Sequence, residues 1–260
     1  RKPRRALVTA PTFAEYATAL ESVGCTVERF FLREQEDFAV TDAFCAAIRP
    51  GVDMVFLCQP NNPTGQLTAL PLVEQILHRC AACGTLLVVD ECFLDFLPDH
   101  ALHTAKGLLG EGNLVILKAF TKLYGMAGVR LGYALSADTA LLEQMQACGQ
   151  PWGVSSLAQA AGLAALEETA YVEKVRALIA EQRPRLTAGL RALGLRVLDG
   201  RANYLLFQAP ETLGEVLRQR GAVLRSCANY PGLGPGWYRT AVRTGPENEQ
   251  LLKLLAEVLE

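Results

Sequence analysis

The stretch "KAFTKLYGMAGVRLGY", residues 118–133, points to both the fold and a site. An apolar run over 113–120 predicts a buried strand, and a glycine-containing turn separates it from a second apolar run over 129–135. Lys122 follows the first run directly. Ligands of open α/β sheets bind beyond the carboxyl ends of strands, so this amine is a candidate for chemistry as well as for simple solvation.

The same alternation of apolar runs with helical patterns occupies the chain before residue 118. Strands are predicted over 4–11, 26–32, 52–60 and 85–91, and helices over 13–24 and 70–84. Strands that read as continuous apolar runs are typical of a sheet that is buried on both faces. We therefore expect an α/β layer, with a mostly parallel central sheet flanked by helices.

The pattern changes after about residue 140. Helical segments dominate 139–193. Strands and helices then alternate, with strands over 195–200, 202–209, 222–227 and 238–244 and helices over 213–220 and 247–259. The expected division is a large domain over 1–140, followed over 141–260 by connecting helices and a smaller α+β domain.

Composition narrows the possible functions. The 260 residues carry 25 basic and 27 acidic side chains, a net charge of −2, which argues against binding to nucleic acid or to a membrane surface. No apolar run has the length that a membrane-spanning helix needs. The eight cysteines are scattered through apolar patterns, which is typical of reduced thiols in a cytoplasmic protein.

Three polar side chains fall where predicted strands end. Asn62 lies in "NNPTG", Asp90 closes "LLVVD" and Lys122 follows "LVILKAFT". Each has a simpler explanation on its own, as a turn residue, a cap and a solvated amine. Together they would bring an amide, a carboxylate and an amine to one edge of the sheet, and that combination is far more specific.

The motifs "NNPTG", "VVDECFLDF" and "FTKLYGMAGVRLGY", in this order, resemble the signature of pyridoxal-phosphate (PLP) aminotransferases of class I/II, fold type I. The resemblance covers essentially the whole chain and implies PLP as cofactor. By position, Lys122 matches the lysine that forms a Schiff base with PLP. Asp90 matches the aspartate that pairs with the pyridine nitrogen, and Asn62 matches the asparagine that binds the ring 3-oxygen.

Further positions match or depart from this family. The resemblance implies that Thr121 and Arg130 hold the cofactor phosphate and that Phe13, in "PTFAEY", stacks on its ring. Phe93 stands where related aminotransferases usually have a tyrosine that donates to the 3-oxygen. Ala119 replaces a hydroxyl residue that often helps to bind the phosphate.

Two parts of the family fold are expected to lie before residue 1. One is the glycine-containing phosphate loop, and the other is the segment that reaches the site of a partner subunit. The chain begins with Arg1 and enters a strand almost at once, so we expect that the N-terminal part of the fold is missing. The resemblance also implies a homodimer.

Three arginines in the C-terminal part could recognise a substrate. Arg225 and Arg239 resemble the pair that binds the anionic groups of the substrate, whereas Arg243 could equally be surface charge. Two anion-binding arginines fit a small amino acid or amine that also bears a phosphate.

Within the family, "RSCANYPGL", "PTFAEY", "DECFLDF" and "QPWGVSSLAQ" resemble the threonine-phosphate decarboxylase branch of cobalamin biosynthesis, which produces aminopropanol phosphate. Phe93 and Trp152 fit this branch better than the histidinol-phosphate aminotransferases. The alternative reaction is transamination, as in those aminotransferases. An alternative of another class is a non-catalytic fold-type-I relative that serves as a binding module.

Other motifs are weaker. "CAAC" at 80–83, with His78, resembles half a metal site without a partner pair, so buried or neutral thiols are favoured. "GMAGVRLG" lacks the glycine order of a dinucleotide loop. The histidines at 78, 100 and 103 show no metal spacing. The sequence therefore predicts no metal site.

Overall fold

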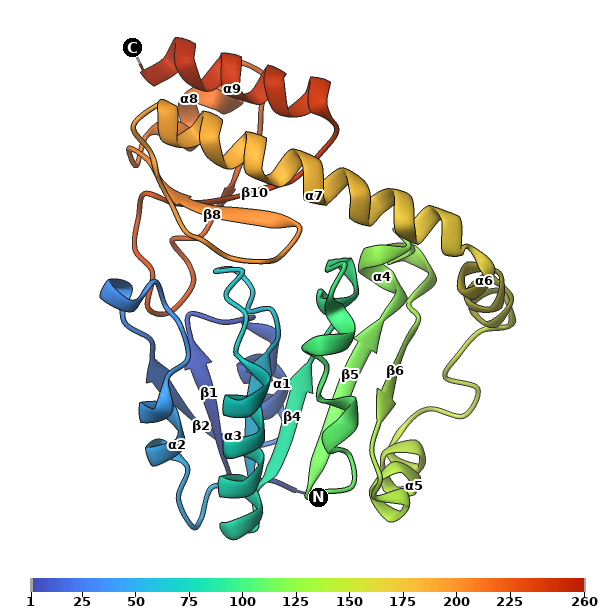
Figure 1. Cartoon of the computed structure of the whole chain (residues 1–260). Helices are drawn as coiled ribbons and strands as arrows, with labels where there is room; N and C mark the ends of the chain where they lie inside the picture. The colour runs from blue at the N-terminus through green and yellow to red at the C-terminus, as the bar shows by residue number, and fades with distance from the viewer. Residues whose placement is uncertain (1, 260) are drawn as a thin grey trace.

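The computed structural model describes residues 2–259, which fold around two β-sheets (Figure 1). The first sheet has six strands in the order β2-β1-β3-β4-β5-β6. Strands β1 to β5 are parallel, and β6 runs antiparallel to β5, so the prediction of a mostly parallel sheet is confirmed. The strands are β1 (Arg5–Ala10), β2 (Thr26–Phe31), β3 (Met54–Cys58), β4 (Leu86–Asp90), β5 (Leu114–Ala119) and β6 (Gly132–Leu135).

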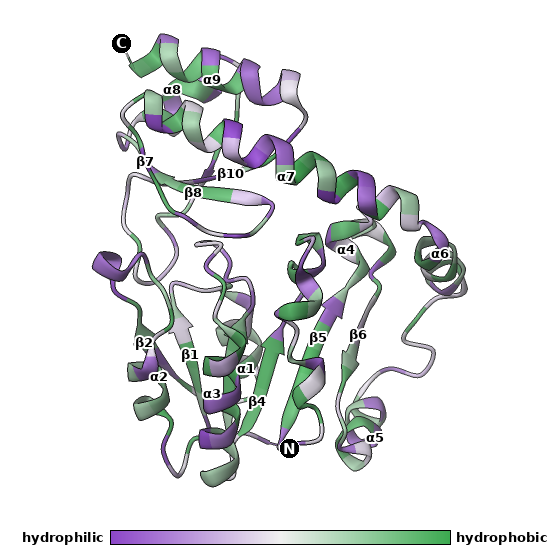
Figure 2. Ribbon diagram, in the orientation of Figure 1, coloured by the Kyte–Doolittle hydropathy of each residue, from purple (hydrophilic) through white to green (hydrophobic). Residues whose placement is uncertain are grey.

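Helices cover both faces of this sheet, which explains the continuous apolar strands (Figure 2). Alternate residues such as Leu87 and Ile116 pack on α3 (Leu70–Ala82) and on α2 (Asp42–Ala47), a short helix that the sequence analysis missed. The intervening strand residues face the opposite side of the sheet, toward α1 (Glu15–Ser22) and α5 (Thr139–Cys148). The remaining helices of this half are short: α4 (Phe120–Leu123) and the 3₁₀ turns η1 (Glu34–Glu36), η2 (Leu94–Phe96), η3 (His100–Leu102), η4 (Ala105–Leu108) and η5 (Ala127–Val129).

Two helices lead to the second sheet. Helix α6 (Ser156–Glu167) lies at the side of the molecule, and the long α7 (Thr169–Ala192) crosses from there to the second sheet (Figure 1). That sheet is antiparallel, in the order β7-β8-β10-β9. Its elements are β7 (Arg196–Val197), β8 (Tyr204–Gln208), α8 (Leu213–Gln219), β9 (Arg225–Ser226), β10 (Trp237–Ala241) and α9 (Gly245–Leu259).

An apolar core lies on the face of the second sheet that is turned away from the first sheet. Leu205 and Phe207 point toward α7, α8 and α9. Leu206 and Trp237, on the opposite face, pack with Leu32 and other residues that follow β2. The strands predicted over 222–227 and 238–244 were too long, because β9 forms only two residues of ladder and the chain after β10 turns into α9.

The second sheet lies over the carboxyl ends of β1 and β4, while α4 and α7 lie above the end of β5 (Figure 1). The "NNPTG" turn makes the contact: the Asn61 carbonyl accepts a hydrogen bond from the Tyr204 hydroxyl at 2.9 Å. Gly200 lies against the same turn, and a Cβ there would approach Gly65 to 2.7 Å. Glycine at 200 is therefore required for this close approach.

A buried charge cluster supports the end of β5. Lys118 Nζ lies 3.0 Å from Glu91 Oε2 and 2.8 Å from Asp95 Oδ1, and Lys118 and Glu91 are almost completely buried. Glu91 also accepts hydrogen bonds from the Thr104 hydroxyl at 2.8 Å and from the Ala105 backbone amide at 2.7 Å. Both charges are thus compensated where they are buried.

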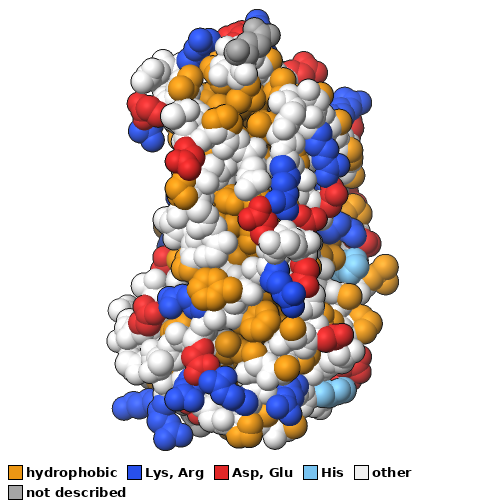
Figure 3. Space-filling view, turned by 90° about the vertical axis from the view of Figure 1, so that its left-hand side faces the viewer, with side chains coloured by type: hydrophobic (Ala, Val, Ile, Leu, Met, Phe, Trp, Pro, Cys, Tyr) orange, Lys and Arg blue, Asp and Glu red, His pale blue; other side chains and the backbone are white. Residues whose placement is uncertain are grey.

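The surface mixes charged and apolar groups. On the face in Figure 3, side chains of both signs are interspersed with apolar patches, and basic side chains gather at the lower end. Among the helices that lie within residues 2–259, none combines the length and apolar character needed to cross a membrane.

Candidate active site

The three strand-end side chains of the sequence analysis meet at one small cavity. Its volume is about 70 Å³, and its walls include Asn62, Asp90 and Lys122. A second cavity of about 330 Å³ lies between the two sheets and shares Lys122 and Phe93 with the first. The amine of Lys122 therefore lies where a carboxylate-lined cavity meets a larger one.

Asp90 is held in place by two hydrogen bonds. Its Oδ2 accepts from the hydroxyl of Tyr16, and its Oδ1 accepts from the Cys92 backbone amide at 2.9 Å. Burial raises the pKa of Tyr16 well above its ordinary value, and Cys58 and Asp90 raise it further, so the phenol keeps its proton. Burial also raises the pKa of Cys58 to about 12, so this cavity thiol is neutral.

Asn62 is oriented by the second sheet. Its side-chain oxygen accepts hydrogen bonds from the Arg239 guanidinium and, at 3.4 Å, from the Tyr230 hydroxyl. Because the oxygen is engaged on that side, the amide NH₂ group is left to donate into the small cavity, whose wall Asn62 forms.

Aromatic rings flank the amine. Lys122 is exposed on α4, and its Nζ lies 5.4 Å from the centroid of the Phe93 ring. Phe13 forms another wall of the small cavity and packs edge-on against Tyr16, with ring centroids 5.5 Å apart. A partly exposed ring at this cavity offers a flat apolar surface to a ligand.

Thr121 and Arg130 lie on the same segment as Lys122. Arg130 adopts a left-handed backbone conformation, with φ of 57°, and its guanidinium donates to the Ala127 carbonyl at 2.9 Å. Within residues 2–259, neither Thr121 nor Arg130 lines the two cavities described above. The structure thus places them beside the site and not in its walls.

The larger cavity is lined by all three candidate arginines. Arg225 and Arg239 are paired across β9 and β10, and within residues 2–259 neither forms an ion pair with a carboxylate. The Arg225 guanidinium donates to Asn229 at 3.1 Å, and that of Arg239 lies 4.9 Å from the centroid of the Tyr204 ring. Arg243 differs, because Glu247 lies 2.7 Å away and compensates its charge.

Sequence reasoning missed two tyrosines of the site. Tyr16 lies three residues after Phe13 on the same helical pattern, so its position near the site could have been found from that spacing. Tyr204 lies more than 140 residues from Asn61, to which it donates. Strand alternation alone could not show that its face of β8 meets the "NNPTG" turn.

The small cavity matches the chemistry of PLP. A pyridine ring with a 3-oxygen and an aldehyde needs a flat apolar surface, a carboxylate at the ring nitrogen, a donor at the oxygen and a primary amine. Phe13, Asp90, Asn62 and Lys122 supply these four features around one cavity. The residues present therefore fit this cofactor.

Comparison with known proteins defines the class. The family model "Aminotransferase class I and II" matches residues 1–258. The chain belongs to this family, whose members are generally PLP-dependent enzymes.

Particular relatives narrow the comparison. The chain is 40% identical to threonine-phosphate decarboxylase of Salmonella typhimurium, over 99% of the chain and 72% of that protein. It is 34% identical to histidinol-phosphate aminotransferase of Lactiplantibacillus plantarum, over 96% of the chain and 69% of that protein. The crystal structure of histidinol-phosphate aminotransferase from Clostridium acetobutylicum has a TM-score of 0.93 at 26% identity and covers 99% of the chain and 78% of the other.

Proposed function

We propose that this protein is a PLP-dependent decarboxylase that converts L-threonine O-3-phosphate to aminopropanol phosphate, the product expected for a step of cobalamin biosynthesis. The observation that carries the proposal is the pair Arg225 and Arg239, two guanidinium groups without carboxylate partners in residues 2–259, in the cavity that Lys122 also lines. The identity to threonine-phosphate decarboxylase supports it.

When bound, PLP supplies an electron sink for the bond that breaks at the substrate Cα. Asp90, oriented by Tyr16 and Cys92, would place negative charge beside the ring nitrogen and so favour its protonated form. Asn62 would donate from its amide to the ring oxygen, and Phe13 would offer its ring face to the cofactor, since both residues line the small cavity. Thr121 and Arg130 would hold the phosphate from the neighbouring loop, since hydroxyl and guanidinium groups suit phosphate oxygens.

Lys122 has two tasks at Nζ. Its amine would hold PLP before the substrate arrives, and once released it could carry a proton to or from the reacting carbon. Its place at the boundary of the two cavities suits both tasks, because one cavity matches the ring and the other holds the arginines.

The arginines decide which bond breaks. PLP would assist only the Cα bond whose electrons can pass into the ring, so the orientation of the substrate would select the bond that is cleaved. Guanidinium groups bind phosphate and carboxylate through paired hydrogen bonds, so Arg225 and Arg239 would fix both ends of a phosphorylated amino acid. Fixing both ends stops rotation about Cα and presents the Cα–carboxylate bond, a form of orientation that can lower a barrier by several kcal/mol.

The second candidate is transamination, supported by the similarity to histidinol-phosphate aminotransferases. In that reaction the same arginines would present the Cα–H bond instead. The protein core around Lys122 would be identical, so the product and not the cofactor distinguishes the two.

The first prediction concerns the product. Protein loaded with PLP and given L-threonine O-3-phosphate is expected to release one CO₂ per substrate consumed and to form aminopropanol phosphate. Arg225→Gln and Arg239→Gln should each lower kcat/KM by about 10–100-fold, because each removes a charged hydrogen-bond donor worth about 1.5–3 kcal/mol. Arg218→Gln is the matched control, since Arg218 is exposed and pairs with Glu215.

Three outcomes would contradict parts of this proposal. Formation of a keto product without release of CO₂ would show that the reaction is transamination and not decarboxylation. Equal losses of kcat/KM in Arg218→Gln and Arg239→Gln would contradict the assignment of Arg239 to substrate binding. An absence of both products, together with no visible absorbance from bound PLP, would favour a non-catalytic binding module.

We also propose that the protein works as a homodimer in the cytoplasm. Apolar side chains near α6 are unusually exposed, with Trp152 96%, Leu157 83% and Leu163 69% accessible, and such groups are typical of an interface. Sedimentation velocity at micromolar concentration should report twice the chain mass, and Leu157→Glu should shift the protein toward monomer. A monomeric parent would contradict the dimer.

The proposal of a cytoplasmic location rests on the eight free cysteines, which support a reducing compartment.

A further inference from the structure

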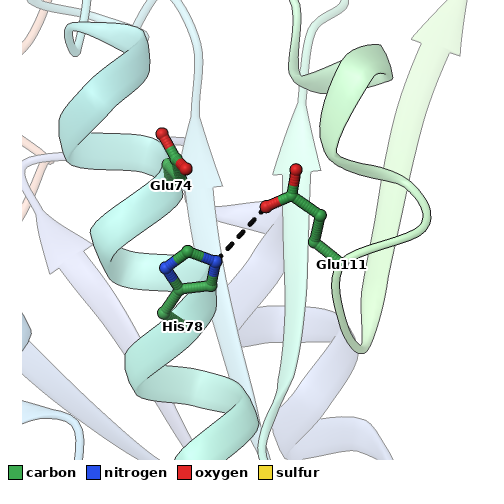
Figure 4. Close-up of side chains that lie close together, drawn as sticks. All are labelled: Glu74, His78 and Glu111. Atoms are coloured by element: carbon green, nitrogen blue, oxygen red, sulfur yellow. Dashed lines mark hydrogen bonds and ion pairs between the residues drawn. The ribbon is translucent and has the colours of Figure 1, made fainter.

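A cluster of possible metal ligands lies on α3, away from the candidate active site. Glu74 and His78 are one helical turn apart, and Glu111 approaches them from the loop before β5 (Figure 4). One ligand atom from each residue lies within 4.8 Å of the others. His78 Nε2 lies 3.2 Å from Glu111 Oε2.

The backbone that carries these ligands is well supported. Gly112, next to Glu111, lies so close to α3 that a Cβ there would be 3.3 Å from a Leu77 methyl and 3.6 Å from Ala81 Cβ. The Glu111 amide donates to the Leu108 carbonyl at 3.0 Å, which forms a turn. Leu77 belongs to the buried core, so the helix and the loop are held together beneath the cluster. Binding of a metal ion would therefore require changes in the side-chain torsions only, with the backbone left in place.

We propose that Glu74, His78 and Glu111 form a Zn²⁺ site. Zinc accepts imidazole nitrogen and carboxylate oxygen at about 2.0–2.2 Å, which places two ligands of a tetrahedral ion about 3.3–3.6 Å apart. The His78–Glu111 separation of 3.2 Å is already close to this range. The nitrogen ligand disfavours Ca²⁺ and Mg²⁺, which prefer oxygen.

Zn²⁺ would lie between His78 and Glu111 in place of their hydrogen bond, and Glu74 would be the third protein ligand. Both His78 and Glu111 are exposed, so water can occupy the remaining position on the ion. The sequence analysis left His78 without a partner because Glu111 is 33 residues further along the chain. Folding brings them together where α3 passes the start of β5.

The site binds metal for stability and not for chemistry. Glu111 lies three residues before β5, whereas Lys122 follows the end of this six-residue strand, about 20 Å away along it. Zinc at this place joins α3 to the loop that enters β5. An ion that binds only the folded chain raises its stability, and the gain grows with the logarithm of the ion's concentration relative to its Kd.

The test is zinc binding by chelator-treated protein in equilibrium dialysis. It is made in a Cys148→Ser background, because Cys148 is an exposed thiol that could itself bind zinc. The parent is expected to bind one Zn²⁺ per chain, and His78→Ala and Glu111→Gln should each weaken binding at least about tenfold. Glu143→Gln, which neutralises an exposed carboxylate elsewhere, should bind like the parent.

Thermal unfolding gives an independent measurement. ZnCl₂ is expected to raise the Tm of the parent and of Glu143→Gln, and to leave His78→Ala and Glu111→Gln unchanged. Circular dichroism without metal would show that all variants are folded. Zinc binding of equal strength in the parent and in both ligand variants would overturn the proposal, as would a parent that takes up no zinc. Ca²⁺ binding as tight as Zn²⁺ binding would overturn the choice of metal.

Discussion

Replacing Lys122 by alanine is expected to lower the rate of CO₂ release from L-threonine O-3-phosphate by about 10⁴-fold or more. Positioned proton transfer alone contributes about 10²–10⁴-fold, and this variant also loses the amine that bonds the cofactor. Lys122 is exposed, so the Tm should change little. The loss would then lie in chemistry and not in folding.

Matched variants sharpen this result. Lys122→Arg keeps the positive charge and removes the nucleophilic amine, so it should be nearly as inactive as Lys122→Ala. Lys106→Ala removes an exposed lysine from η4 and should retain parent activity. The absorbance band that depends on the bond between PLP and the lysine amine is expected in the parent and should be lost in both Lys122 variants. Activity of Lys122→Ala within tenfold of the parent would refute the assignment.

The second large effect is on stability. Lys118→Met should lower the free energy of unfolding by about 3–5 kcal/mol, because it leaves Glu91 buried without its cation. Burial alone would lower the pKa of Lys118, but Glu91 and Asp95 outweigh it and raise the pKa above its ordinary value. The contribution of the Lys118 ammonium to the free energy of unfolding is therefore fully present below the ordinary lysine pKa. It is lost only as the pH rises through the pKa of Lys118 in the folded state.

Calorimetry at neutral pH measures this effect. For a chain of this length, a loss of about 3–5 kcal/mol corresponds to a decrease in Tm of roughly 6–20 °C. The double variant Lys118→Met, Glu91→Gln should recover part of the loss, because the charge left behind is removed as well. Lys253→Met changes a lysine on α9 outside this cluster and should alter the Tm by only a degree or two. A Lys118→Met variant as stable as that control would contradict the buried ion pair.

Local patterns predicted the elements that have strong periodicity. Strands β1, β3, β4 and β5 are largely apolar runs, and helices such as α3 and α7 have long patterns, so their existence could be found from sequence. Short elements depend on their surroundings. The two-residue β9 and the six-residue α2 make few local contacts of their own, which explains why one was overextended and the other missed.

By itself the sequence determined the parallel layer, the motifs at its strand ends and the family that they resemble. Asn62, Asp90 and Lys122 could be grouped because parallel strands end at a common edge. Only the tertiary structure decided which side chains orient two of them, with Tyr16 donating to Asp90 and Arg239 donating to Asn62 across 177 residues. It also placed Glu111 beside His78, away from this site. Such contacts depend on how separate elements pack, and no local propensity or periodicity encodes that packing.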